Sequence, residues 1–122
     1  MEAIINDKAY RSIRTFLERR DFDIIESNWA HGKDSIDFIA KEDGDLVFIS
    51  CAVHDNEGRG LGDEKGDRQS FERIAAAYLV ESQNIAEGNV RFDIITMLVL
   101  GDHKGLLRHH RNALSAAGSD LR

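Results

Sequence analysis

Histidine is the side chain whose charge and metal affinity change most readily near neutral pH, and this chain has only five histidines. Three of them, His103, His109 and His110, lie close together near the C-terminus, where they could bind a metal ion. Their spacing matches no strong ligand motif, and adjacent histidines on a helix point in different directions. We therefore interpret them as surface histidines.

The single cysteine, Cys51, lies within an apolar run, where a small core residue is expected rather than a nucleophile. One cysteine cannot form an internal disulfide, which fits a reducing compartment. The sequence contains no apolar stretch long enough to span a bilayer, and its N-terminus lacks the basic region and apolar core of a signal peptide. We expect a cytoplasmic protein with no membrane partner.

A glycine-rich segment runs from Asp55 to Gly66. Its glycines at 58, 60 and 62 follow a predicted strand, but they lack the Lys-Ser/Thr pair of a Walker motif and the spacing of a dinucleotide fingerprint. We interpret the segment as a mobile loop rather than a phosphate-binding one.

Charge is unevenly distributed along the chain. The net charge is −6, and residues 21–87 hold 16 carboxylates against 6 basic residues, a segment that should repel phosphates. Anion-facing patches are therefore expected only at the two basic flanks. The candidate nucleic-acid-binding residues there are Lys8, Arg11, Arg14, Arg108 and Arg111, with Arg19, Arg20 and Lys104 beside them.

The elements that must position these groups fit one domain spanning residues 1–122, because 122 residues that are 42% apolar suffice for a single core. Asn6 or Asp7 can cap a first helix that ends near Arg20. Strands are predicted at 22–29, 35–40 and 46–54. The third is apolar almost throughout, which predicts an interior strand covered on both faces.

The second half of the chain predicts a helix and a strand. Apolar residues recur at helical spacing from Phe71 to Leu79, and Gly88 closes the helix. A long strand is predicted at 90–100, then a turn at 101–105, a short strand or coil, and a weak terminal helix at 109–117. The order helix, three strands, helix, strand indicates an α/β fold with a mixed sheet flanked by helices.

This order resembles the restriction-endonuclease-like, or PD-(D/E)XK, core, and the residues resemble the YraN-like family of small bacterial proteins over roughly positions 8–114. The likeness lies in an ordered series of stretches, each weak alone. They are Phe16-Leu17-Glu18-Arg19-Arg20, Ile24-Ile25, Asn28-Trp29, Ile36-Asp37-Phe38-Ile39-Ala40, Leu46-Val47-Phe48-Ile49, Ala77-Tyr78-Leu79, Arg91-Phe92-Asp93-Ile94, His109 and Asn112-Ala113.

The resemblance implies a Gly-Glu-x-Asp signature entering the second strand, a Glu-x-Lys signature on the third and a glutamate in the first helix. Asp37 matches the aspartate of the first signature. Ser35 stands in place of its glutamate, Ser50 and Ala52 stand in place of Glu-x-Lys, and Tyr10 falls near the helical glutamate. The chain is thus expected to be a degenerate member of the family.

These replacements remove the groups that phosphodiester hydrolysis needs. Such nucleases use Mg²⁺ held by carboxylates to activate water and to stabilise charge on the phosphoryl oxygens. Residues two apart on a strand share a face, so Ser50 and Ala52 offer a hydroxyl and a methyl where an acid and an ammonium would project together. We expect no cofactor, since Mg²⁺ would be expected only at an active site.

Several alternatives remain at this stage. Asp37 could rebuild a metal site with His54 and either Asp55 or Glu57 from the glycine-rich segment. Alternatively, its carboxylate has a structural role, pairing with Arg91 or capping a backbone turn. Trp29 and Phe22 are expected to be core or strand-edge aromatics, although an exposed Trp29 could stack on a base.

Three functional hypotheses follow. The first is a nuclease-fold domain that does not cleave and acts by binding a protein partner or by self-association. The second is a nucleic-acid-binding module that uses the basic flanks and loses affinity steeply with salt. The third, a metal-dependent endonuclease with relocated ligands, requires the rebuilt metal site and ranks last.

Overall fold

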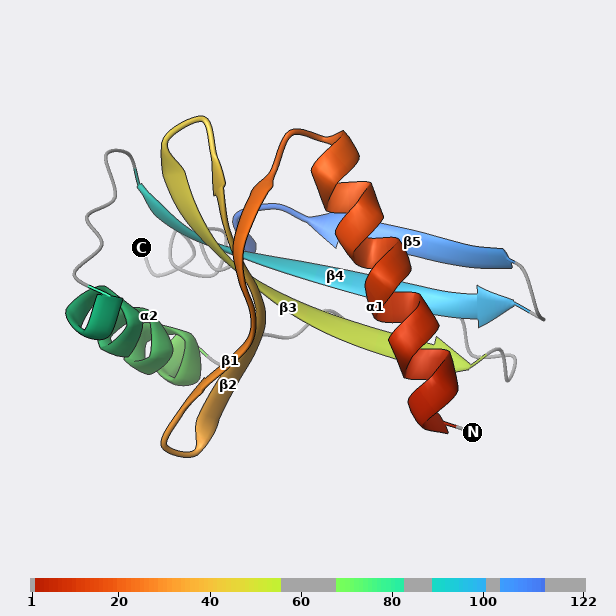
Figure 1. The fold of residues 1–122 in the computed structure, drawn as a ribbon, viewed down its shortest axis with the longest axis horizontal. Helices are drawn as coiled ribbons and strands as arrows, with labels where there is room; N and C mark the ends of the chain where they lie inside the picture. The colour runs from red at the N-terminus through yellow and green to blue at the C-terminus, as the bar shows by residue number, and fades with distance from the viewer. Residues whose placement is uncertain (1, 56–67, 83–88, 101–103, 114–122) are drawn as a thin grey trace, which may run out of the picture.

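The computed structural model of the chain describes residues 2–55, 68–82, 89–100 and 104–113. These residues form two helices and five strands, in the order α1, β1, β2, β3, α2, β4, β5 (Figure 1). The bounds are α1 Glu2–Arg19, β1 Asp23–His31, β2 Asp34–Glu42, β3 Asp45–Asp55, α2 Arg68–Ser82, β4 Val90–Leu100 and β5 Lys104–His110.

The five strands form one mixed sheet in chain order, β1-β2-β3-β4-β5. The β3 and β4 strands are parallel, with paired residues running from Leu46 opposite Val90 to Asp55 opposite Val99. The other three pairs are antiparallel. Because parallel neighbours need a crossover connection, the chain between β3 and β4 leaves the sheet, and it carries α2.

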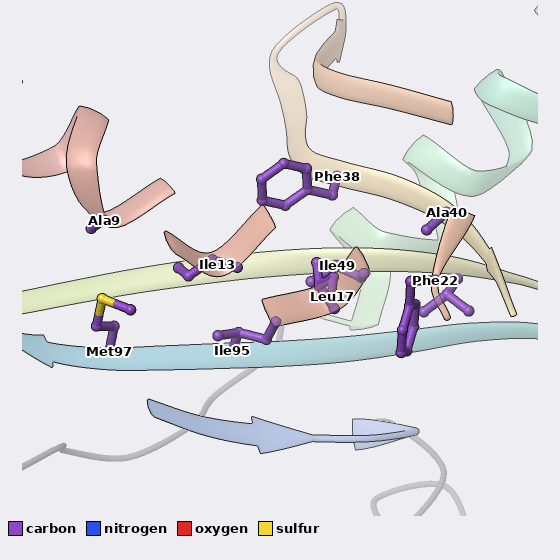
Figure 2. Close-up of a cluster of buried hydrophobic side chains, with 10 residues drawn as sticks. Ala9, Ile13, Leu17, Phe22, Phe38, Ala40, Ile49, Ile95 and Met97 are labelled. Atoms are coloured by element: carbon purple, nitrogen blue, oxygen red, sulfur yellow. The ribbon is translucent and has the colours of Figure 1, made fainter. Parts of the chain in front are cut away.

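Helix α1 covers one face of the sheet and lies across the central strands in Figure 1. Its buried residues Ala9, Ile13 and Leu17 recur at intervals of four, so they lie on one side of the helix. They pack against side chains of three strands (Figure 2). The strand residues of this cluster are Phe38, Ala40, Val47, Ile49, Ile95 and Met97, and Phe22 joins them at the end of α1.

Helix α2 packs against the opposite face. Its inner residues are Phe71, Ile74, Ala75 and Tyr78, as its apolar spacing predicts. The strand residues that they meet include Leu46 and Phe48, which alternate along β3 with the residues facing α1. The β3 strand is therefore covered on both faces near its start, which confirms the prediction of an interior strand.

The observed order confirms the predicted helix, three strands, helix and strand. The ends of the first three strands differ from the prediction by one or two residues, and two other boundaries differ by more. Helix α1 begins at Glu2 rather than after Asn6 or Asp7. The predicted terminal helix at 109–117 is wrong at its start, because His109 and His110 pair with β4 as the end of β5. Residues 114–117 and the predicted loop at 56–66 lie outside the described residues. Neither described helix is long and apolar enough to cross a membrane.

A buried carboxylate joins the ends of β4 and β5. The Asp93 side chain is 0% exposed and accepts hydrogen bonds from Arg91 Nε at 3.0 Å and from the backbone N–H of Asn112 at 2.8 Å. His109 Nε2 lies 2.9 Å from its second oxygen. A fully buried charge is stable only when it is paired and hydrogen-bonded, so these three partners are what allow Asp93 to remain in the core.

The same network extends to β2. Glu42 Oε1 accepts hydrogen bonds from Arg91 at 2.7 Å and from Arg111 at 2.6 Å. Both guanidinium groups also lie over the ring of Phe22, at 5.8 and 5.6 Å from its centroid. Cations from β4 and from the residues after β5, both bonded to Glu42 of β2, thus lie over one aromatic ring at the end of α1, which stabilises that end of the sheet.

We predict that Asp93→Asn lowers the free energy of unfolding, measured by urea denaturation, by about 3 kcal/mol or more, because removing one partner of a buried ion pair leaves the other charge uncompensated. Asp7→Asn is the matched control. It makes the same chemical change in an exposed pair, with Arg11 at 3.6 Å, and should cost less than about 1 kcal/mol. Similar losses in the two variants would contradict this account of the buried network.

The network also predicts acid lability. Burial opposes ionisation of Asp93 and Glu42, but hydrogen bonds from His109 and Arg91 to Asp93, and from Arg111 and Arg91 to Glu42, outweigh it and hold both carboxyl pKa values below their usual range. A carboxyl group whose pKa is lower in the folded state than in the unfolded state stabilises the protein fully above the unfolded-state pKa of about 4. This stabilisation is lost as pH falls from there through the folded-state pKa. The urea concentration at the unfolding midpoint should therefore decrease as pH is lowered below about 4, and the decrease should be less steep in Asp93→Asn than in the parent chain. Parallel pH profiles of the two proteins would contradict the prediction.

Candidate functional site

The site indicated by the sequence lies where β2 separates from β3. Cα pairing of β2 with β3 extends from Glu42 only as far as Phe38 opposite Ile49, whereas pairing of β2 with β1 continues to Asp34. Ile36 packs on the α2 side and Phe38 on the α1 side, although residues two apart on a regular strand share a face. The β2 strand therefore changes face at Asp37. We call this point the β2–β3 fork.

Asp37 bridges the fork with its side chain. Its Oδ2 accepts a hydrogen bond from the backbone N–H of Cys51 at 2.6 Å, just beyond the last Cα pair of the β2–β3 ladder. The carboxyl group also forms a hydrogen bond with the hydroxyl of Tyr10 on α1. The side chain thus provides the acceptor that the departing backbone of β2 no longer offers to Cys51, and it ties α1 to the fork.

The environment of Asp37 disfavours its ionised form. Burial raises the pKa of the Asp37 carboxyl above its usual value, and the hydrogen bonds from Cys51 and Tyr10 offset this only in part. Burial and the nearby Asp37 charge raise the pKa of Tyr10 to about 12, so its hydroxyl keeps its proton and can donate. No cationic side chain contributes to the pKa shift of Asp37, in contrast to Asp93.

The positions that the family resemblance singles out are only partly brought together. Tyr10 and Asp37 are in contact, although they belong to different elements and are far apart in the sequence. Ser50 and Ala52 flank Cys51 on β3, and since Cys51 packs against the α1 side, strand alternation directs their half-buried side chains to the opposite face. Ser35 is exposed on β2 beyond the fork.

The expected alternatives for Asp37 have different outcomes. Pairing with Arg91 is wrong, because Arg91 bonds to Glu42 and Asp93 at the other end of β2. Asp37 does bind a backbone N–H, but that of Cys51 within strand β3 rather than one in a turn. Within residues 2–55, 68–82, 89–100 and 104–113, no group of three His, Cys, Asp or Glu residues could hold a metal ion. His54 is exposed at the end of β3. Glu57 and the Asp55 side chain lie outside what the structure describes.

The histidines are not the surface group that the sequence suggested. His109 is 9% exposed in its side chain and lies edge-on to Phe16, with ring centroids 5.9 Å apart, in addition to its contact with Asp93. It belongs to the buried network rather than to a histidine cluster. His110 is half-buried on β5, and His103 lies outside the described residues.

The candidate cations of the basic flanks occupy different settings. Arg14 donates to Glu18 at 3.3 Å and to Ser27 at 2.9 Å, and Arg111 is held by Glu42. Lys8 and Arg11 are exposed on the outer side of α1, and Arg108 is exposed on β5. Arg19, the last residue of α1, and Arg20, which follows it, line an open hollow with Lys8 and Arg11.

The remaining predicted core residues pack as expected. Phe22 is 3% exposed, and Trp29 is half-buried with its ring 5.2 Å from that of Tyr78 in an edge-on arrangement. Cys51 packs against the α1-side cluster, and burial, together with the nearby Asp37 charge, raises the pKa of its thiol. A protonated, packed thiol is a poor nucleophile, which agrees with a core role.

Sequence reasoning missed the network of Glu42, Arg91, Asp93 and His109. One signal was available: Arg91 and Asp93 are two apart on a predicted strand and so share a face, where opposite charges pair readily. The contribution of Glu42 and His109 was not readable, because they lie 49 and 16 residues from their partners in the chain.

Comparison with known proteins adds the family. The model of the family described as "Uncharacterised protein family UPF0102" matches residues 11–97. A UPF0102 protein of Lachnoclostridium phytofermentans is 30% identical over 107 residues, 85% of this chain and 86% of that protein. UPF0102 protein BF0634 of Bacteroides fragilis is 32% identical over 85 residues, 68% of this chain and 69% of its own.

A third relative, UPF0102 protein FN1370 of Fusobacterium nucleatum, is 29% identical over 84 residues, 67% of this chain and 71% of that protein. The matched segment 11–97 includes the second half of α1, the β2–β3 fork, α2 and the Arg91 and Asp93 pair on β4. The resemblance to the YraN-like family is thereby confirmed, and the chain belongs to the UPF0102 family.

Proposed function

We propose that this chain is a nuclease-fold domain that does not cleave nucleic acid and that works by binding a macromolecular partner. The element order and the parallel β3–β4 crossover are compatible with a restriction-endonuclease-like core. The observation that carries the proposal is the state of Asp37, the one residue that keeps the signature of the resemblance. Its carboxyl group is engaged by Cys51 and Tyr10 and its ionised form is disfavoured.

A metal-dependent nuclease needs the opposite arrangement. Mg²⁺ is bound by ionised carboxylates with free lone pairs in near-octahedral geometry. At the β2–β3 fork, the helix position implied for a glutamate carries Tyr10, whose hydroxyl forms a hydrogen bond with Asp37 and brings no negative charge to a cation. Loss of one preorganised electrostatic group typically costs about 3–4 kcal/mol in the barrier, so the loss of several removes useful catalysis.

A protein partner or a second copy of the chain remains the first of the binding hypotheses drawn from the sequence, and nucleic acid is the second. The distribution of charge on α1 favours nucleic acid, because Lys8, Arg11, Arg19 and Arg20 line the same hollow on its outer side. A nuclease with relocated ligands ranks last, since it requires a metal site rebuilt around Asp37, whose ionised form is disfavoured.

Cleavage assays test the proposal. Labelled single-stranded, duplex and branched DNA, incubated with micromolar protein and Mg²⁺ or Mn²⁺, should stay intact, as they do with EDTA. In parallel, 10 mM Mg²⁺ should leave the thermal unfolding midpoint unchanged. A Mg²⁺ site with a dissociation constant of about 0.1 mM would instead raise the midpoint, because binding would add about 2.7 kcal/mol to the free energy of unfolding. Metal-dependent cutting that Asp37→Ala abolishes would overturn the proposal.

A second prediction separates a structural Asp37 from a metal-binding one. Asp37→Ala should lower the free energy of unfolding by about 1–3 kcal/mol, since the N–H of Cys51 loses its acceptor. Asp37→Asn keeps an acceptor oxygen and removes a buried charge, so at pH 7 it should be as stable as the parent chain or more so. A raised folded-state pKa costs stability as pH rises through it, so the advantage of Asp37→Asn should grow from pH 4 to pH 7.

Urea denaturation at these two pH values provides the measurement. Asparagine and alanine variants that lose the same free energy at pH 7 would mean that the negative charge itself is needed at the fork. That result would contradict the role of Asp37 as a hydrogen-bond acceptor for the separated strands.

A further inference from the structure

The outer side of α1 combines cationic and hydroxyl side chains along one line. Lys8, Arg11, Ser12, Thr15, Arg19 and Arg20 border an open hollow on this side of the helix, and all six are exposed. Phe16, half-buried between them and the sheet, closes its base and carries the Arg20 guanidinium 4.5 Å above its ring. We call these six residues the α1 basic face.

Neutralising carboxylates lie mostly on the neighbouring side of the helix. At 100° per residue, Glu18 and Asp7 fall on the flank that carries Arg14, which bonds to Glu18. Arg11 has an exposed ion pair with Asp7 at 3.6 Å, a contact too weak to hold it away from a ligand. Among the described residues, Lys8 and Arg19 make no ion pair. The α1 basic face therefore keeps a local positive charge in an acidic protein.

This arrangement fits a phosphate backbone. Arginine, lysine, serine and threonine side chains are those that contact nucleic-acid phosphates, and such contacts need no base recognition. Lys8 and Arg19 are eleven residues apart, about 17 Å along the helix axis, a length over which duplex DNA carries about ten phosphates on its two strands. A helix lying against the backbone reaches only those on the near side, about three or four.

A protein partner fits the face less well. Protein interfaces depend on apolar or aromatic anchors at a desolvated centre. The aromatic side chain at the α1 basic face is Phe16, which is half-buried and covered by Arg20, and the other residues of the face are charged or carry hydroxyls. Desolvating several cations without an apolar centre is costly, whereas phosphates pair with them at a wet interface.

We propose that the α1 basic face binds the phosphate backbone of nucleic acid without sequence preference. The inference deepens the proposed non-cleaving function and rests on it. The surface lies on the opposite side of α1 from Tyr10 and the β2–β3 fork, so binding does not require an active nuclease centre.

Fluorescence anisotropy with a labelled 24-base-pair duplex of arbitrary sequence, and with one of its strands, tests the proposal. The logarithm of the binding constant should fall with the logarithm of salt concentration with a slope of about −3, which corresponds to three or four neutralised phosphates. The variant Lys8→Gln/Arg19→Gln should bind at least tenfold more weakly at 50 mM salt, with a slope reduced by about 2.

Two matched variants serve as controls. Lys33→Gln/Lys41→Gln removes the same charge from exposed positions of the β1–β2 hairpin and should change affinity less than threefold. Lys8→Arg/Arg19→Lys keeps the charge and should retain binding. Circular dichroism should show that all variants fold, since every substituted side chain is exposed.

Three outcomes would overturn the proposal. The first is that micromolar protein binds neither probe at 50 mM salt. The second is that Lys33→Gln/Lys41→Gln weakens DNA binding as much as Lys8→Gln/Arg19→Gln does. The third is concentration-dependent self-association, measured by sedimentation, that Lys8→Gln/Arg19→Gln abolishes. The proposed function fails separately: if the duplex is cut when Mg²⁺ is added to the same samples, the chain is a nuclease, whatever the binding data show.

Discussion

The parallel pairing of β3 with β4 is the constraint on which the rest of the structure depends. Parallel neighbours cannot be joined by a tight turn, so the chain must leave the sheet between them, and the crossover places α2 on one face. The other face of the same pair carries Ile49, Ile95 and Met97, which need α1 to cover them. The two helices and the antiparallel strands outside the pair are arranged around this requirement.

Two aspartates show how the surroundings of a buried carboxylate decide its state. Asp93 is fully buried, yet hydrogen bonds from His109 and Arg91 outweigh the cost of burial and lower its pKa. Asp37 receives its hydrogen bonds from a neutral hydroxyl and a backbone N–H, which are too few to outweigh burial, and its pKa rises. The first aspartate behaves as the anion of a structural ion network, and the second as a hydrogen-bond acceptor between separated strands.

Helix α1 connects these features with the proposed function. Its inner side supplies core residues and the Tyr10 hydroxyl that engages Asp37. Its outer side exposes a line of cations, and its C-terminal end meets Phe22, over which Arg91 and Arg111 lie. One helix thus contacts the β2–β3 fork on its inner side and exposes a charged surface on its outer side.

The sequence by itself determined the element order, the double-sided burial of β3 and the identity of the family. These features depend on the local spacing of apolar residues and on an ordered series of short motifs. It did not determine the ends of α1 or the extension of β5 through His109 and His110, because terminal boundaries depend on contacts rather than on local spacing.

Only the tertiary structure decided which charged groups meet. Arg91 lies two residues from Asp93, but it also reaches Glu42 across 49 residues of chain, and Asp37 bonds to Cys51 rather than to Arg91. Sequence periodicity fixes the face on which a side chain lies but not its partner there, since the partner depends on strand register and on the point where β2 leaves β3. The separation of β2 from β3, which no local pattern encodes, makes Asp37 a link between two strands and a helix.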